Sequence, residues 1–126
     1  MPSPIERAVR TYIRAAEERD PSARAKLLEA CFAEDGRFVT RSSVIRGPAG
    51  VDAMFARFHA DPKVLGVRMA SVIDAIGTTF RYRSVVELHD GTSLEFFDAG
   101  EIDADGKIST LLVFAGPLAD ALTVVR

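Results

Sequence analysis

The two halves of the chain carry different hydrophobic periodicities, and this division constrains the fold more than any other feature. Up to about residue 62, apolar side chains recur at the spacing of buried helix faces, whereas residues 67–114 alternate between apolar and polar. Helices and strands that are segregated along a chain are typical of an α+β domain. We expect one such domain over residues 1–126, because this length suits a single core.

Three helices are expected in the first half, and the first has the clearest start signal. Ser3 can cap it, Pro4 occupies its first position, and Glu6 completes a capping box. Tyr12 falls on the apolar face of this helix, among aliphatic side chains.

The second helix is expected to begin at Asp20-Pro21 and to end at Asp35-Gly36, and the third to run from Gly47-Pro48 to Asp61-Pro62. The only cysteine, Cys31, lies at the end of the apolar stripe of the second helix. A buried, inert thiol is therefore expected rather than a nucleophile.

The strands are expected to form a mainly antiparallel sheet. Asp90-Gly91 and Asp105-Gly106 are tight-turn signals that indicate hairpins. The tail beyond Gly116-Pro117 receives no assignment. Two short strands are expected near residues 37–40 and 44–46, followed by a meander over residues 67–76, 79–89, 94–102 and 107–114.

Composition excludes several classes of function. The formal net charge of -2 and the sequence pI of about 5.7 argue against nucleic acid as a partner, because phosphate binding needs a concentrated basic surface. No apolar run is long enough to span a bilayer, and the first residues lack the layout of a signal peptide. We therefore expect a cytoplasmic protein that does not bind membranes.

Asp98 is the most informative polar residue, because alternation places it on the apolar face of its strand. That face also carries Leu94, Phe96 and Ile102, whereas the neighbouring acids fall on the opposite face. A carboxylate among apolar groups must find a partner or keep its proton, and such groups are candidates for chemistry.

Two alternatives remain open for this carboxyl group. If Arg81 and Arg83 of the preceding strand face the same interior, Asp98 is an anion in an ion pair; if they face outward, a neutral acid is favoured. Tyr12 has a similar pair of interpretations, as a core tyrosine with a hydrogen-bonded hydroxyl or as part of a pocket.

Four segments together resemble one superfamily. They are residues 12–16 (YIRAA), 28–35 (LEACFAED), 47–55 (GPAGVDAMF), and Phe97-Asp98 with residues 102–108 (IDADGKI). Their order and spacing resemble those of the NTF2-like superfamily, within it the SnoaL-like polyketide cyclases and the ketosteroid isomerases. The resemblance implies an NTF2-like (cystatin-like) conical barrel, with three N-terminal helices packed on a strongly curved sheet around a deep pocket. It also implies a homodimer formed through the outer sheet face.

The resemblance further implies roles for Tyr12 and Asp98, which match the tyrosine and the protonated aspartic acid that stabilise an oxyanion in the isomerases. The position of the general base in those enzymes is occupied here by Thr40, and an unaided hydroxyl cannot shuttle protons near neutral pH. His59, His89 and Asp74 are alternative bases without supporting motif spacing.

Other residues are given structural roles. His89 precedes a turn, and His59 ends a helix, where an imidazolium would suit the helix dipole; together they give no metal-ligand spacing. Most of the large apolar residues are expected in the core, with several lining the pocket. The candidate pocket-lining residues are Phe32, Phe38, Thr40, Met54, Phe55, Phe58, Phe96 and Phe114.

Three functions fit these observations. The first is an enzyme without cofactor or metal, an isomerase, cyclase or hydratase/dehydratase. It would polarise the oxygen of a compact apolar carbonyl compound through Tyr12 and Asp98. The second is a non-catalytic protein that binds an apolar ligand, which the threonine at position 40 favours. The third is a dimerisation module, because one fold hosts many functions.

Overall fold

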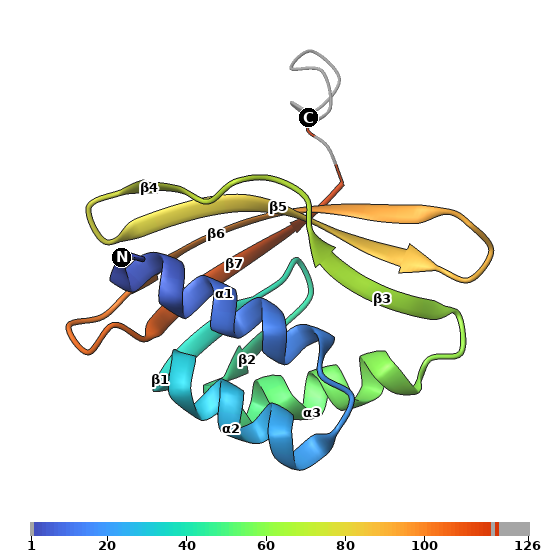
Figure 1. The fold of residues 1–126 in the computed structure, drawn as a ribbon, viewed down its shortest axis with the longest axis horizontal. Coiled ribbons are helices and arrows are strands. Elements are labelled where there is room, and N and C mark those ends of the chain that lie inside the picture. Colours follow the sequence, from blue (N-terminus) through green and yellow to red (C-terminus); the bar gives the residue numbers. More distant parts are fainter. Residues whose placement is uncertain (1, 117, 119–126) are drawn as a thin grey trace.

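The computed structural model describes residues 2–116 and residue 118. Its three helices are α1 (Pro4–Glu17), α2 (Pro21–Cys31) and α3 (Gly47–Ala60) (Figure 1). The strands are β1 (Phe32–Val39), β2 (Val44–Arg46), β3 (Val64–Met69), β4 (Asp74–Ile76), β5 (Thr79–Leu88), β6 (Ser93–Ile102) and β7 (Ile108–Ala115).

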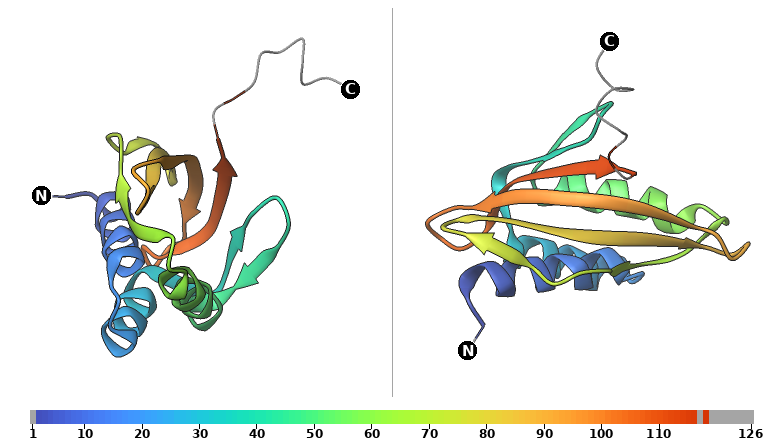
Figure 2. Two further views of the ribbon diagram at one scale, coloured as in Figure 1. Left: turned by 90° about the vertical axis from the view of Figure 1, so that its right-hand side faces the viewer. Right: turned by 90° about the horizontal axis from the view of Figure 1, so that it is seen from above.

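The strands form one curved sheet in the order β2-β1-β7-β6-β5-β3, with β4 also paired to β5. All pairs are antiparallel except β1 and β7, which run parallel. Figure 2 shows the strong curvature, with the three helices gathered along one side. The described strands do not close into a complete barrel, but the expected α+β architecture of three helices on a strongly curved sheet is confirmed.

The helix starts follow the predicted caps. Ser3 Oγ accepts a hydrogen bond of 3.1 Å from the backbone of Glu6, and Asp20 accepts one of 2.9 Å from Ala23. The third helix begins instead at Gly47, whose φ of 71° favours glycine. A Cβ there would lie 2.8 Å from the carbonyl oxygen of Glu34, so glycine also allows this close approach.

The predicted end of the second helix is wrong. Helix α2 stops at Cys31, and Phe32 already pairs with Ile108 of β7 as the first residue of β1. The pairing register then shifts between Phe32 and Arg37. Pairing with a distant strand, which local sequence does not reveal, ends the helix before Asp35-Gly36.

The strand predicted over residues 67–76 is two strands, β3 and β4. Between them the backbone of Ala70 donates to Arg83 O at 2.8 Å, and Arg83 N donates to Ser71 Oγ at 2.7 Å. This side-chain bond replaces a ladder bond, so the strand is interrupted there.

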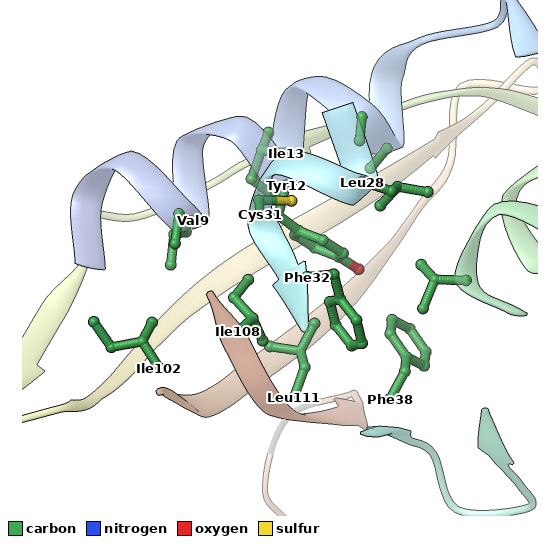
Figure 3. Close-up of a cluster of buried hydrophobic side chains, with 14 of the residues drawn as sticks. Val9, Tyr12, Ile13, Leu28, Cys31, Phe32, Phe38, Ile102, Ile108 and Leu111 are labelled. Atoms are coloured by element: carbon green, nitrogen blue, oxygen red, sulfur yellow. The ribbon is translucent and has the colours of Figure 1, made fainter. Parts of the chain in front are cut away.

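The core lies between the helices and the inner face of the sheet. Figure 3 shows its centre, where Val9, Leu28, Phe32, Ile108 and Leu111 are each at most 1% exposed. Cys31 is also buried, and burial raises the pKa of its thiol to about 12, as expected for an inert cysteine.

A buried arginine joins the three helices. Arg24, 2% exposed, donates from Nε to Asp52 Oδ1 of α3 at 2.6 Å and from Nη1 to the carbonyl of Glu18, just after α1, at 3.1 Å. Among the described residues, no helix is both long and apolar enough to cross a membrane.

Candidate functional site

A polar cluster lies inside the otherwise apolar core. In the sheet, Tyr82 of β5 and Val113 of β7 lie directly opposite Asp98 of β6, on either side of it, so the three side chains share the inner face. Ser84 follows Tyr82 on the same face of β5. Tyr82, Ser84 and Asp98 are 2%, 5% and 4% exposed.

Helix α1 contributes Tyr12, which is 4% exposed and points from the helix into the core toward Phe32 and Phe38 (Figure 3). Tyr12 and Asp98 are close enough that the carboxylate charge raises the pKa of the tyrosine, although burial raises it more. The two residues singled out in the sequence are therefore both buried and interact electrostatically.

Burial raises the pKa of Asp98 to about 7, although the neighbouring hydroxyl groups of Tyr82 and Ser84 act to lower it. Burial also holds the pKa of Tyr82 well above its usual value, and the charge of Asp98 raises it further. Near neutral pH the hydroxyl groups of both tyrosines therefore keep their protons. The carboxyl group of Asp98 is present in both its neutral and its ionised form.

Two oxygens of the cluster are left with hydrogen-bonding capacity. Asp98 Oδ1 and Tyr82 Oη are buried and have no hydrogen-bond partner among the described residues. Tyr82 is thus close enough to perturb the carboxyl group without forming a well-aligned hydrogen bond to it. A buried polar group without a partner costs free energy, so both atoms favour a polar ligand group.

The open question about the arginines is decided by their position. Arg81 Nε contacts Asp74 Oδ2 at 2.8 Å, and Arg83 Nη1 contacts Glu95 Oε1 at 3.5 Å, and the four side chains are all at least half exposed. Both arginines lie on the outer face, where they do not neutralise Asp98. This agrees with the interpretation of Asp98 as an acid that can be neutral.

Thr40 lies in the turn after β1 and not in the polar cluster. Its Oγ1 is 3.0 Å from Ser43 Oγ and accepts a bond of 3.1 Å from Ser43 N. These bonds give Thr40 a structural role in the β1–β2 hairpin.

The three alternative bases also lie outside the polar cluster. His89 is exposed in a turn, and Asp74 is engaged by Arg81 on the outer face. His59 Nε2 lies 2.9 Å from the carbonyl of Ala16, and burial lowers its pKa. The ring donates from Nε2 to the end of α1, and the lowered pKa favours its neutral form.

A groove with a volume of about 400 Å³ adjoins the cluster at the end of the sheet. Phe96 and Val113 are its inner-face wall, and Val113 is the cross-strand partner of Asp98. Tyr12 and Asp98 are not among the residues that line this groove. The lining residues are Val39, Thr40, Arg41, Ser42, Phe96, Leu112, Val113, Phe114 and Ala115.

The candidate pocket residues divide into two groups. Thr40, Phe96 and Phe114 line the groove, although Phe114 is 54% exposed and is not part of the core. The other five belong to the core or pack against it, namely Phe32, Phe38, Phe55, Met54 and Phe58.

Sequence reasoning missed Tyr82 and Ser84 as site residues. Alternation places both on one face of their strand, but only the register of β5 against β6 brings that face next to Asp98. The available signal was a tyrosine and a serine on an otherwise apolar strand face.

Solved structures with the same fold are similar over most of the chain. A SnoaL-like family protein from Agrobacterium tumefaciens, proposed to be an isomerase, has a TM-score of 0.79 at 23% identity, covering 90% of this chain and 98% of that one. An M. tuberculosis LEH-like epoxide hydrolase has a TM-score of 0.66 at 18% identity, covering 90% and 82%. An NTF2-like protein of unknown function from Burkholderia pseudomallei has a TM-score of 0.65 at 16% identity, covering 91% and 92%.

No protein-family model matches the chain, and no curated protein matches it in sequence. Structural similarity at these identities shows the fold alone, which is that of the NTF2-like proteins. The fold implied by the sequence resemblance is therefore confirmed. The fold alone does not determine the function, because one fold hosts several functions.

Proposed function

We propose that this protein is an enzyme that moves a proton on a compact apolar carbonyl compound without a cofactor, in an isomerisation, cyclisation or hydration reaction. The proposal rests on the state of Asp98. Its carboxyl group is buried, has a pKa of about 7, and has one oxygen without a hydrogen-bond partner among the described residues. A general acid or base works best when its pKa lies near the working pH.

Each polar residue of the cluster has a role in this chemistry. Ionised Asp98 accepts a proton from the carbon next to the carbonyl group, and the electron pair left by the C–H bond moves onto the carbonyl oxygen. The hydroxyls of Tyr12 and Tyr82, which stay protonated, donate hydrogen bonds to that oxygen as its charge develops. In an isomerisation, Asp98 returns the proton to another carbon of the enolate. In a cyclisation, the enolate carbon first forms a C–C bond to a second carbonyl group of the same molecule, and Asp98 gives the proton to the resulting alkoxide. In a dehydration, the enolate expels a β-hydroxide, which takes the proton from Asp98 and leaves as water, and hydration is the reverse of this step.

The surroundings of the cluster support this assignment. The apolar side chains of the core exclude water, which strengthens hydrogen bonds to a developing charge. The alternative bases lie elsewhere, so Asp98 takes the role that an aspartate at position 40 would otherwise have. The proposed isomerase and the epoxide hydrolase with this fold are consistent with such chemistry in it.

Deuterium exchange tests the proposal without knowledge of the natural substrate. The ketone 2-tetralone is incubated with the protein in D2O, and loss of the proton next to its carbonyl is followed by NMR. We expect exchange faster than in buffer, rising with pH through about 7 as Asp98 ionises. Asp98→Asn is expected to lower the enzyme-dependent rate by at least about 100-fold, the lower range for a general base.

The pH dependence separates two roles of the same residue. If Asp98 acts as a neutral hydrogen-bond donor, as in the isomerases that the sequence resembles, exchange falls as the pH passes 7. Exchange no faster than in buffer at every pH, together with saturable binding of the ketone, would instead support the binding protein favoured by Thr40.

A further inference from the structure

The β1–β2 hairpin is basic in a chain that is acidic overall. Residues 37–46, which are the paired part of the hairpin and its turn, contain Arg37, Arg41 and Arg46 and no Asp or Glu, although Glu34 and Asp35 precede them on β1. Arg37 and Arg46 lie opposite each other on the two strands, and Arg41 lies in the connecting turn. Among the described residues, none of the three forms an ion pair, so residues 37–46 carry uncompensated positive charge.

This hairpin forms one side of the groove. Strand β1 pairs with β7 as far as Val39 and Leu112, and beyond that point residues 113–115 are paired only to β6 among the described strands. Figure 2 shows the hairpin and the end of β7 diverging, and the groove lies between them. Its volume of about 400 Å³ is in the range of small-molecule sites.

The charge in the groove has one sign. Arg41 is the only charged residue among the described residues that line it. A second pocket, which shares Phe96 and Ala115 with the groove, contains the acidic residue Glu95. This residue forms an ion pair with Arg83 on the outer face. An apolar wall that ends in an unpaired guanidinium group complements an apolar molecule with an anionic end.

We propose that the groove binds the apolar body of an organic acid, with its carboxylate held by Arg41. Resting on the proposed function, this makes the substrate an apolar oxo acid whose carbonyl group reaches the Asp98 cluster. The distance is short, because Val113 lines the groove and is the direct cross-strand neighbour of Asp98, and such neighbours have Cβ atoms about 5 Å apart.

A matched pair of fluorescent dyes tests the anionic end. The sulfonate of 8-anilino-1-naphthalenesulfonate stands in for the carboxylate, and N-phenyl-1-naphthylamine has the same rings without the charge. Arg41→Gln is expected to raise the Kd of the sulfonate dye about three- to tenfold and that of the uncharged dye less than about twofold, as for a partly exposed charge pair. Arg41→Lys, which keeps the charge, is expected to recover part of the affinity.

Arg57→Gln is the control, because it removes the same charge from an exposed position of α3 that does not line the groove. Unchanged sulfonate affinity in Arg41→Gln, an equal loss of both dyes, or an equal loss in the control would overturn the proposal. Thermal melts confirm that each variant is folded.

The two proposals fail in distinguishable ways. If Arg41→Gln weakens the sulfonate dye but wild-type protein does not accelerate deuterium exchange, the acid-binding groove stands and the enzymatic function fails. If exchange is accelerated and needs Asp98 while Arg41→Gln changes neither dye, the groove proposal fails alone.

Discussion

Tyr82 and Asp98 face each other across neighbouring strands inside the core, and each has a buried oxygen without a hydrogen-bond partner. A sequence selected for stability alone would place apolar residues at both positions, since an unsatisfied buried polar group costs about 1–3 kcal/mol. The pair therefore marks a place where stability is given up, which is characteristic of functional sites.

Tyr82→Phe separates the effect of this hydroxyl group on stability from its effect on catalysis. Removing an unpaired hydroxyl is expected to leave the free energy of unfolding unchanged or raise it by up to about 1 kcal/mol, while deuterium exchange into 2-tetralone falls about tenfold or more. Urea unfolding and the exchange assay measure the two quantities on the same sample. Val64→Ala, at a buried position of β3 opposite Leu88 and far along the sheet from Tyr82, is the reverse control, and it is expected to lose stability but not exchange. A parallel loss of stability and exchange in Tyr82→Phe would show that the hydroxyl is structural.

The raised pKa of Asp98 predicts a pH-dependent stability with a definite sign. The folded state binds the Asp98 proton more tightly than the unfolded state does. The stability contributed by this proton is therefore fully present below about pH 3.8 and is lost as the pH rises to about 7. Between these limits the loss is roughly 2–4 kcal/mol. Asp98→Asn is expected to remove this slope and to be more stable than wild type at pH 8. Unfolding curves at pH 4, 6 and 8 for both proteins give the difference, and parallel pH profiles would contradict it.

Arg24 is expected to be important for the stability of the helical layer. Arg24→Ala leaves Asp52 and the carbonyl of Glu18 without their donor and creates a cavity, at a cost of about 2–4 kcal/mol. Arg10→Ala is the matched control, because its ion pair with Glu6 is exposed and contributes less than about 0.5 kcal/mol. Chemical unfolding distinguishes them, and similar losses in the two variants would refute the special role of the buried pair.

The outer face of the sheet is proposed to mediate the homodimer. Phe97 and Phe114 lie opposite each other there and are 38% and 54% exposed, so two neighbouring aromatic side chains are exposed on this face. Phe97→Arg is expected to convert the dimer into a monomer in light scattering at micromolar concentration. Val72→Arg, at a position that is 83% exposed on another part of the surface, is expected to leave it dimeric. A monomeric wild type would refute this interface.

The elements that local chemistry specifies could be predicted from the sequence. The cap and proline pairs gave the starts of α1 and α2, and the alternation around Asp98 gave its face correctly. The end of α2 could not be predicted, because the parallel pairing of Phe32 with Ile108 joins residues far apart in the chain. Tyr82 and Ser84 were missed for the same reason, since their proximity to Asp98 depends on strand register.

The groove was predicted least well. Thr40, Phe96 and Phe114 were among the candidate pocket residues and line this groove. Arg41 was not among them, because a turn arginine is usually solvated and nothing local shows that β1 and β7 separate beside it. The tail beyond Gly116, apart from Leu118, lies outside the described residues.

The protonation of Asp98 is the central claim, and an NMR titration of its carboxyl carbon tests it most directly. Selective labelling of aspartate and comparison with Asp98→Asn identify the signal. We expect a midpoint near pH 7, with the signal of the neutral acid still present at pH 6. A midpoint near 4, the ordinary value for an exposed aspartate, would contradict the account.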